Sequence, residues 1–363
     1  MAYQICDPFD SYGNNFGLTA SYPWTNVTGS PTVINTDSRF PSPAAGIPVG
    51  CLSVNPSNYA RGNLVGTPSS LIVPVGVKFI GLPTSSPNDF LTFWDSGKFQ
   101  VSLAVTSNGG LQFYRGNGLA PGSGGQALNA AIGTLTPNGT VVPGTWYGML
   151  IQVTFNGSSG SVQLNLNGSS SAVINSSSLN TAPTTNAYAT QVGLGNTANA
   201  GFAVVRYDDF LCLDTTGAFL NTPPTNDTRL IQKLPTQAGF YTNWTPTGLA
   251  ANWQNAAVAP PNTSDYNANN TGGTKDSYTP PTAGLTTNPL MVMARGSLYR
   301  DDAGPHTPSL MVRSGSTDGV GSALPPITSS PLYYDTVFQN DPNTSSAWTG
   351  ANADAAQVGV VEG

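Results

Sequence analysis

The stretch TWYGMLIQVTFNGSSGSVQLNLNG, residues 145–168, decides how this chain is expected to fold. Apolar and polar side chains alternate in two runs, at 149–155 and at 161–167, which is the period of a half-buried β-strand. Between the runs lies NGSSG (156–160), a segment of the kind that joins two antiparallel strands. Asn167-Gly168 ends the second run with another turn signal. The stretch therefore predicts a β-hairpin.

The same alternation recurs on both sides of this hairpin. Residues 70–80 place five apolar side chains on one face, with Pro74 and Gly76 on the other, and the proline predicts an edge strand. Helical periodicity is nearly absent, and the one candidate for a short helical turn is 124–135. Further strands are expected at 100–106, 202–213, 290–293, 309–312, 331–338 and 357–361.

The composition of the sequence and its strand pattern change after Leu213. Residues 214–236 hold broken strands and proline pairs, and 243–281 are dominated by polar and small residues. We therefore expect an all-β chain whose main domain is followed by a smaller one. The expected boundaries are 1–215 for an antiparallel β-sandwich, 216–240 for a connecting segment and 241–363 for a smaller β-rich domain. Because small cores are marginally stable, the second domain is expected to depend on the first.

Charge is sparse in this chain of 363 residues. Charged residues make up 8%, against about 25% in a typical soluble domain, whereas hydrophobic residues reach 39%, enough for a core. A surface of hydroxyls and amides suits a protein held in an assembly, since a free cytosolic protein usually carries more charge. The net charge is −6, and the 12 lysines and arginines are scattered. We therefore expect no nucleic-acid binding, which needs clustered positive charge.

The amino terminus, MAYQICDPFDSYGNN (1–15), has no basic segment and no apolar run, so no signal peptide is expected. No apolar run approaches the about 20 residues that cross a bilayer, so no membrane insertion is expected. Cys6, Cys51 and Cys212 are far apart and odd in number. We interpret them as buried apolar side chains in a chain folded in a reducing cytoplasm, with a Cys6–Cys51 disulfide as the alternative.

The single histidine, His306, lies in a glycine- and proline-rich stretch with Asp301, Asp302 and Ser309. A Ser-His-Asp nucleophilic site uses these residue types, but the stretch predicts an exposed loop, and we expect an ordinary loop histidine. One histidine and three dispersed cysteines do not supply a zinc site. GNGLAPGSGG (116–125) is expected to be a loop, because it neither follows a clear strand nor opens a helix as a nucleotide-binding motif does.

Carboxylate pairs of the kind that glycosidases use are scarce. The chain has one glutamate, Glu362, and Asp208 and Asp209 are the obvious aspartate pair. Neighbouring strand residues point to opposite faces, so we expect one of the two to cap a loop and the other to face solvent. A calcium site that includes Asp214 beside this pair is the alternative. The expectation is a protein that is not an enzyme, with no catalytic residue, no cofactor and no metal.

In residues 145–168 a tryptophan opens a strand, a short Gly/Ser turn follows, and the next strand ends at Asn-Gly. This pattern resembles the central hairpin of laminin-G-like domains, which have the concanavalin-A-type jelly roll. The resemblance implies two antiparallel sheets packed face to face over residues 1–215. It also implies that FDSY (9–12) is the first strand and YDDFLCLD (207–214) the last.

The order of the later motifs is similar to a group of tailed-bacteriophage virion structural proteins. In that group a glycine often precedes the aspartate of an Asp-x-Arg segment, whereas Asn226 precedes Asp227 here. The motifs that carry the likeness are YDDFLCLDTTGAFLN (207–221), NDTRLI (226–231), WTPTGLAANWQ (244–254), TSDYNANNTGGTKDSY (263–278) and NDPNTSSAWTGANADAAQVGV (340–360).

This second resemblance implies a surface-exposed head or tail accessory of a phage particle, such as a fibre, a decoration or part of an adsorption apparatus. It would act by assembly and binding, with other virion proteins as partners, after synthesis in the host cytoplasm. Phage appendages are often trimers, so a homo-oligomer is expected. The alternative is a lectin-like protein that recognises host-surface glycans, since one fold serves many functions. A polysaccharide depolymerase is a third interpretation, which the carboxylate count disfavours.

Four aromatic residues in polar, turn-rich sequence are candidates for contact with a glycan or a partner protein, because exposed aromatics stack on sugars and anchor interfaces. The alternative is that they fill the small core of the second domain. They are Trp244, Trp253, Tyr266 and Tyr278.

Overall fold

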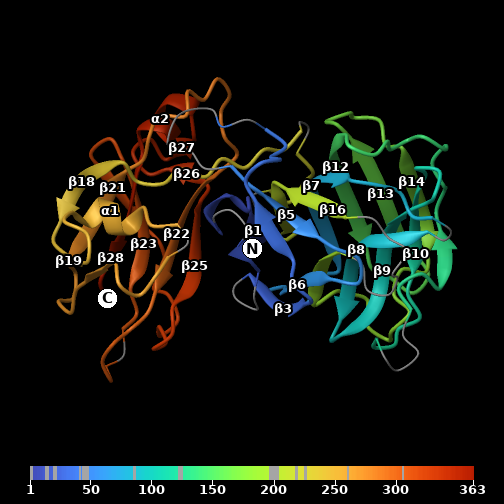
Figure 1. Ribbon diagram of the computed structural model, residues 1–363, viewed down its shortest axis with the longest axis horizontal. Coiled ribbons are helices and arrows are strands. Elements are labelled where there is room, and N and C mark those ends of the chain that lie inside the picture. Colours follow the sequence, from blue (N-terminus) through green and yellow to red (C-terminus); the bar gives the residue numbers. More distant parts are fainter. Residues whose placement is uncertain are drawn as a thin grey trace. The chain divides into compact units, whose positions relative to one another are not determined.

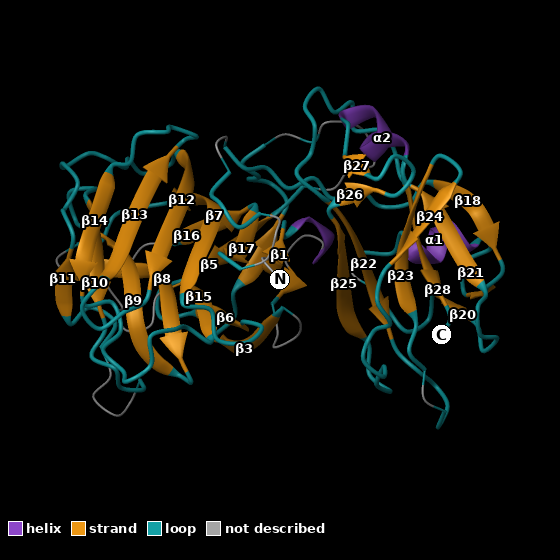
Figure 2. Cartoon of the chain, turned by 180° about the vertical axis from the view of Figure 1, so that it is seen from behind, coloured by secondary structure: helices purple, strands orange, loops and turns teal. Residues whose placement is uncertain are grey.

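The computed structural model describes residues 3–12, 16–18, 23–40, 42, 49–84, 87–121, 126–195, 204–216, 220–224, 227–259, 261–304 and 306–363. The regular structure in these residues is almost entirely antiparallel β-sheet, which confirms the predicted all-β class (Figures 1 and 2). The chain divides into two compact units. Unit 1 comprises Met1–Arg39 and Gly50–Leu230, and unit 2 comprises Phe40–Val49 and Ile231–Gly363. The division after Leu230 falls inside the segment 216–240.

Unit 1 is a sandwich of two antiparallel sheets. The larger, ten-stranded sheet runs in the order β14 (Ile174–Leu179), β13 (Gly160–Leu166), β12 (Trp146–Thr154), β7 (Ser70–Phe79), β16 (Val205–Asp208), β5 (Cys51–Val54), β4 (Thr32–Ile34) and β2 (Phe16–Gly17), while β17 (Phe210–Asp214) pairs with β7 and with β1 (Tyr3–Asp7). The seven-stranded sheet runs in the order β11 (Ala130–Ile132), β10 (Leu111–Arg115), β9 (Lys98–Val105), β8 (Asn88–Asp95), β15 (Gln191–Gly195), β6 (Tyr59–Asn63) and β3 (Trp24–Thr28).

The predicted hairpin at 145–168 is present as β12 and β13. Met149 pairs with Leu166 at one end and Thr154 with Ser161 at the other, so NGSSG forms the connection. Four buried positions of β12 alternate toward the sandwich interior, namely Tyr147, Met149, Ile151 and Val153. The alternation that predicted this hairpin is thus the alternation between its buried and its outer face.

The prediction that residues 70–80 form an edge strand is wrong. β7 lies inside the larger sheet, with β12 on one side and β16 and β17 on the other. Pro74 is tolerated because the neighbouring strand is interrupted opposite it: β16 pairs up to Asp208↔Gly76, and β17 pairs from Leu213↔Ile72. A proline therefore costs no ladder hydrogen bond on that side.

Two local predictions are also corrected. Residues 9–12 do not form the first strand; that strand is β1, and Asp10–Tyr12 is a single 3-10 turn, η1. The chain turns there because the Asp7 carboxylate accepts hydrogen bonds from the Phe9 amide, the Tyr12 hydroxyl and the Trp24 indole. Within 124–135, Ala130–Ile132 is β11, paired with β10, instead of a helical turn, and 124–125 lie outside the described residues.

Aromatic side chains fill the space between the two sheets. Phe79 of β7 packs edge-on against Phe90 of β8 with ring centroids 5.0 Å apart. Phe93 packs in the same way against Phe155, at 5.7 Å. Full burial of each such ring contributes about 1.5–3 kcal/mol to the stability of the fold. The three cysteines, Cys6, Cys51 and Cys212, are free thiols and buried, which confirms their interpretation as apolar core side chains.

Unit 2 is built on a five-stranded antiparallel sheet with its own buried cluster around Trp348 and Leu310. The strand runs predicted at 290–293, 309–312, 331–338 and 357–361 each overlap a strand of unit 2. Two of these strands belong to the five-stranded sheet, and the other two form a separate pair. In order across the sheet lie β18 (Gln237–Thr242), β21 (Lys275–Thr279), β28 (Gln357–Val361), β23 (Ser309–Ser314) and β24 (Thr317–Val320). The described residues of unit 2 also form three separate strand pairs, namely β19 (Thr245–Thr247) with β20 (Tyr266–Ala268), β22 (Val292–Leu298) with β25 (Leu332–Phe338), and β26 (Asn340–Asp341) with β27 (Ser346–Ala347). They contain two short helices, α1 (Asn252–Ala256) and α2 (Gly350–Ala355). In the part of the chain that the structure describes, no helix is long and apolar enough to span a membrane.

Candidate functional site

The outer face of the seven-stranded sheet carries polar and aromatic side chains in register. Along one row, Arg61 of β6 pairs with Gly193 of β15, which pairs with Thr92 of β8. In the next row, Gln191 of β15 pairs with Trp94 of β8. Because successive strand residues point to opposite faces, the residues between these positions fill the sandwich core, and these positions face outward.

Arg61 reaches across β15 to the aromatic residues of this face. Its guanidinium carbon lies 4.4 Å from the ring centroid of Trp94 and 5.6 Å from that of Tyr59. Gly193 of β15 leaves room for the side chains of β8, since a Cβ at that position would meet Thr92 Oγ1 and the Trp94 indole nitrogen. A cation over a tryptophan face gains about 0.5–2 kcal/mol, with the larger value when water is excluded.

The Arg61 side chain is strongly buried without a compensating charge. The residue is only 8% exposed, and its Nε has no hydrogen-bond partner. No ion pair formed among the described residues includes it. Burial lowers the pKa of the guanidinium, and nearby Tyr59 opposes that change. An uncompensated buried charge is costly, so this arrangement suits a ligand that supplies the missing partner.

A second unsatisfied group lies on the same face. Oε1 of Gln191 is buried and has no partner, while its Nε2 donates to Oδ1 of Asn63 at 2.7 Å. Asn63 is exposed, and Tyr59 and Gln191 are half-buried. We refer to Tyr59, Arg61, Asn63, Trp94 and Gln191 as the Arg61 cluster.

A loop covers the neighbouring part of this face. Gln100 of β9 donates from Nε2 to Thr184 Oγ1 and to the carbonyl oxygens of Asn186 and Tyr188, all at 2.9 Å. Asp95 accepts hydrogen bonds from Thr184 and Asn186 as well. The loop that contains 184–188 is thereby fixed over β8 and β9. On the β6–β15 side of the face, Asn63 is exposed and Tyr59 and Gln191 are half-buried.

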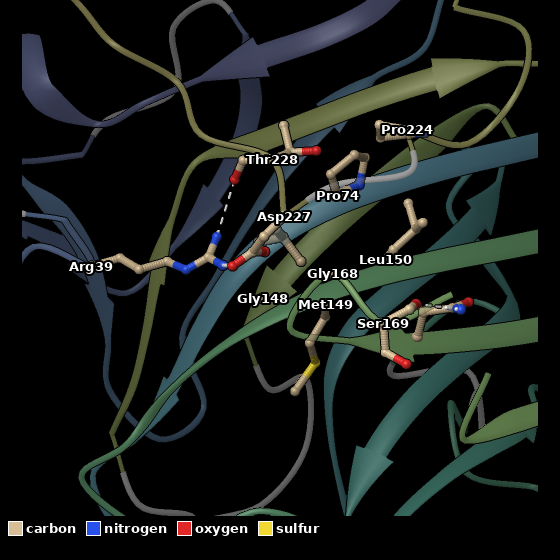
Figure 3. Close-up of a pocket in the computed structure, with 12 residues that line it drawn as sticks. Arg39, Pro74, Gly148, Met149, Leu150, Gly168, Ser169, Pro224, Asp227 and Thr228 are labelled. Carbon is tan, nitrogen blue, oxygen red and sulfur yellow. Dashed lines mark hydrogen bonds and ion pairs between the residues drawn. The ribbon is translucent and has the colours of Figure 1, made fainter. Parts of the chain in front are cut away.

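The outer face of the larger sheet carries a different polar feature, shown in Figure 3. Arg39 is ion-paired with Asp227 and donates to the carbonyl oxygen of Thr228 at 3.1 Å. These groups lie against Gly148 of β12, where a Cβ would meet both Arg39 and Asp227. The pocket beside them has a volume of about 20 Å³, room for a single water molecule. It is too small for a sugar ring.

Asp208 and Asp209 belong to the same structural network, and the prediction that one of them faces solvent is wrong. They are 4% and 2% exposed. Asp208 accepts from the Arg39 amide at 2.7 Å, and Asp209 accepts from the Leu230 amide at 2.6 Å. Burial and the neighbouring carboxylate raise the pKa of Asp208 to about 8, and burial raises that of Asp209 to about 6. The pair holds the segments before Phe40 and after Asp227 onto the sheet.

The alternative calcium site is not formed by the residues that the sequence suggested. Asp214 accepts from Gln4 Nε2 at 2.6 Å and from the Thr216 hydroxyl, also at 2.6 Å. Within the described ranges, no group of three His, Cys, Asp or Glu side chains is placed to hold a metal ion.

His306 contacts two carboxylates. Its Nδ1 lies 2.7 Å from Glu362 Oε1, and its Nε2 lies 3.0 Å from Asp302 Oδ1. The ring therefore links a loop to the last residues of the chain, and both of its nitrogens are engaged.

The four candidate aromatics of unit 2 are not equivalent. Trp244, Trp253 and Tyr266 are half-buried, and their contact with a glycan or partner stays a prediction. Tyr278 is 8% exposed, and its hydroxyl donates to Asp276 Oδ2 and accepts from Asn267. For Tyr278 the alternative, a core position, fits the structure.

Sequence reasoning did not single out Arg61 or Trp94. The available signal was a charged residue between Ala60 and Gly62 in a short strand-like run. Its burial against Trp94, however, depends on the register of three strands that are far apart in the sequence, and no local pattern reports that register.

No protein-family model matches the chain, and no match was found among curated proteins. The cellulose-induced protein Cip1 is similar in structure at 16% identity and a TM-score of 0.40, over 61% of this chain and 98% of that one. Domain 4 of AbnA, an extracellular arabinanase from Geobacillus stearothermophilus in complex with arabinotriose, gives 14% and 0.33, over 58% and 93%. Trypanosoma rangeli sialidase in complex with 2,3-difluorosialic acid gives 12% and 0.34, over 56% and 30%. At these values the likeness carries no information about what this chain binds.

Proposed function

We propose that this chain is a lectin-like protein that binds carbohydrate on the outer face of the seven-stranded sheet. The observation that carries the proposal is the Arg61 guanidinium, buried against Trp94 and Tyr59 without a counter-charge. Sugar sites combine an aromatic surface with a few fixed donors and acceptors. Tyr59 supplies a half-buried aromatic ring, and Arg61 supplies hydrogen-bond donors. Gln191 Oε1 is a buried acceptor to which no protein group donates a hydrogen bond.

A binding role is favoured over hydrolysis because the obvious carboxylates already have structural partners. Asp208 and Asp209 are buried beneath Arg39 and backbone amides, and Glu362 is bonded to His306. A glycosidase needs two carboxyl groups that both reach the scissile bond. Release of reducing ends from a bound polysaccharide would overturn this part of the proposal.

The second candidate function is a structural component of a bacteriophage particle, at the head or the tail. It is favoured by the order of the motifs between 207 and 360 and by the 8% content of charged residues. The two functions are compatible, because a particle protein that binds host glycans has both. Mass spectrometry of purified phage particles and antibody labelling in electron micrographs test it. Absence of the protein from intact particles would remove this candidate and leave the lectin-like one.

The carbohydrate proposal is tested with the full chain on a panel of immobilised bacterial surface polysaccharides. We expect selective binding to a subset of the panel, with at least tenfold weaker binding by Tyr59→Ala. The matched control is Tyr188→Ala, an aromatic residue of the loop that covers β8 and β9. A flat response across the panel would contradict the proposal.

A further inference from the structure

We propose that the Arg61 cluster binds an anionic glycan, and that Arg61 holds a carboxylate of that glycan. This inference rests on the proposed carbohydrate binding and specifies its ligand class.

Arg61 differs from the other well-buried arginines of the chain. Arg39 is paired with Asp227, Arg295 with Asp335 and Arg313 with Asp318. Those three side chains are 5%, 10% and 12% exposed, and the fold supplies a carboxylate for each of them. A buried Nε without a partner also occurs at Arg115, Arg206 and Arg300, but these three residues are only half-buried. Among the described residues, no ion pair includes Arg61, which is 8% exposed as a whole residue. The missing partner is an anion.

The geometry selects the kind of anion. A guanidinium that lies over an aromatic ring presents its N–H groups within its own plane, where a planar carboxylate accepts two parallel hydrogen bonds. Trp94 lies against one side of the guanidinium, whose carbon is 4.4 Å from the ring centroid. Gln191 Oε1 and Asn63 lie in the adjacent row of the sheet and match hydroxyl groups of the sugar that carries the acid.

The chain as a whole does not attract anions. Its net charge is −6, so long-range attraction cannot account for binding of a polyanion. Recognition must come from short-range contacts at Arg61. We therefore expect discrimination between a carboxylate and its uncharged ester on the same sugar backbone, and no general affinity for polyanions.

The test measures binding of the full chain to four carboxylated polysaccharides, namely polygalacturonate, alginate, hyaluronate and polysialate, each paired with its methyl ester. Dextran sulfate serves as a polyanion without carboxylates. We expect at least one acid form to bind ten times more tightly than its ester. Arg61→Gln should abolish that preference, and Arg61→Lys, which keeps the charge but not the planar fork, should retain only part of it. Lys98→Gln removes an exposed charge from the same sheet and is the control.

The outcomes separate this inference from the function on which it rests. Equal binding of acid and ester forms, or binding of neutral polysaccharides only, would overturn the anionic assignment and leave carbohydrate binding intact. Equal binding of dextran sulfate, or loss of binding in Lys98→Gln but not in Arg61→Gln, would also overturn it. Binding of no polysaccharide at all would overturn both. The wild-type comparison of acid and ester requires no variant, so it holds even if Arg61→Gln folds poorly.

Discussion

The only histidine of the chain is hydrogen-bonded to its only glutamate: Nδ1 of His306 lies 2.7 Å from Oε1 of Glu362. Glu362 directly follows β28, and His306 lies three residues before β23, the strand that pairs with β28. The contact therefore fastens the loop before β23 to the carboxyl end of unit 2. Asp302 of the same loop accepts from the other ring nitrogen.

This contact predicts a raised pKa for His306. The hydrogen bonds to Glu362 and Asp302 raise the pKa of His306 above its ordinary value of 6.5. Because the folded-state pKa lies above the unfolded one, the stabilisation is complete below pH 6.5 and is lost as the pH rises through the folded value. A proton NMR titration reads a single histidine directly. Glu362→Gln should shift its pKa downward, and a wild-type value at or below 6.5 would contradict the contact.

The buried aspartates of unit 1 predict a second pH dependence. The pKa of Asp208 is raised by burial from 3.8 to about 8, so the folded state keeps a proton that the unfolded chain has already released. The free energy of unfolding of unit 1 should therefore decrease as the pH rises from 5 to 8. Urea denaturation followed by tryptophan fluorescence measures this slope. Asp208→Asn should make it shallower, and an unchanged slope would show that Asp208 is ionised throughout.

Gly148 provides space for the Arg39–Asp227 ion pair. A Cβ there would meet both side chains, so Gly148→Ala should displace them and lower the free energy of unfolding by about 1–3 kcal/mol. It should also expose residues 227–230 to limited proteolysis. Gly157→Ala is the control, since a Cβ at that exposed turn meets nothing within 4 Å. Equal stability of the two variants would remove the assigned role of Gly148.

The burial of Tyr278 gives a prediction for unit 2. Its hydroxyl donates to Asp276 at 2.9 Å and accepts from Asn267 at 3.0 Å. Tyr278→Phe removes one hydrogen bond from each partner, although Asp276 Oδ2 and Asn267 Nδ2 both keep a bond to Asn252. The loss of two buried hydrogen bonds should cost about 1–3 kcal/mol in thermal or urea unfolding. Tyr266→Phe, at a half-buried tyrosine whose hydroxyl bonds none of the described residues, should cost little. A loss no greater than that of the control would place Tyr278 outside the core.

Local sequence patterns predict the strands of this chain well, because burial of one face imposes an alternation that is visible in residues 149–155 and 161–167. They fail where distant segments decide the outcome. Pro74 argued for an edge, yet the break between Asp208 and Leu213 on the neighbouring strand admits it. Asp208 and Asp209 looked like a strand pair on opposite faces, yet Asp209 has a φ of 52°, and both side chains are buried under the segments that contain Arg39 and Leu230.

The candidate site was harder to predict than the fold for the same reason. Arg61 and Trp94 are 33 positions apart, and they meet only through β15, whose Gly193 lies between them. The aromatics that the sequence did suggest lie in unit 2. Three of them, Trp244, Trp253 and Tyr266, are half-buried despite their polar surroundings in the sequence, and Tyr278 is buried.

Hydrogen–deuterium exchange of the full chain, with and without the polysaccharide that binds best in the panel, tests the central claim most directly. The account predicts slower exchange in β6 and β15, around Arg61 and Gly193, with no change in β12 and β13 on the opposite sheet. Protection confined to unit 2, or spread evenly over both sheets of unit 1, would contradict the assignment of the outer face of the seven-stranded sheet as the binding surface.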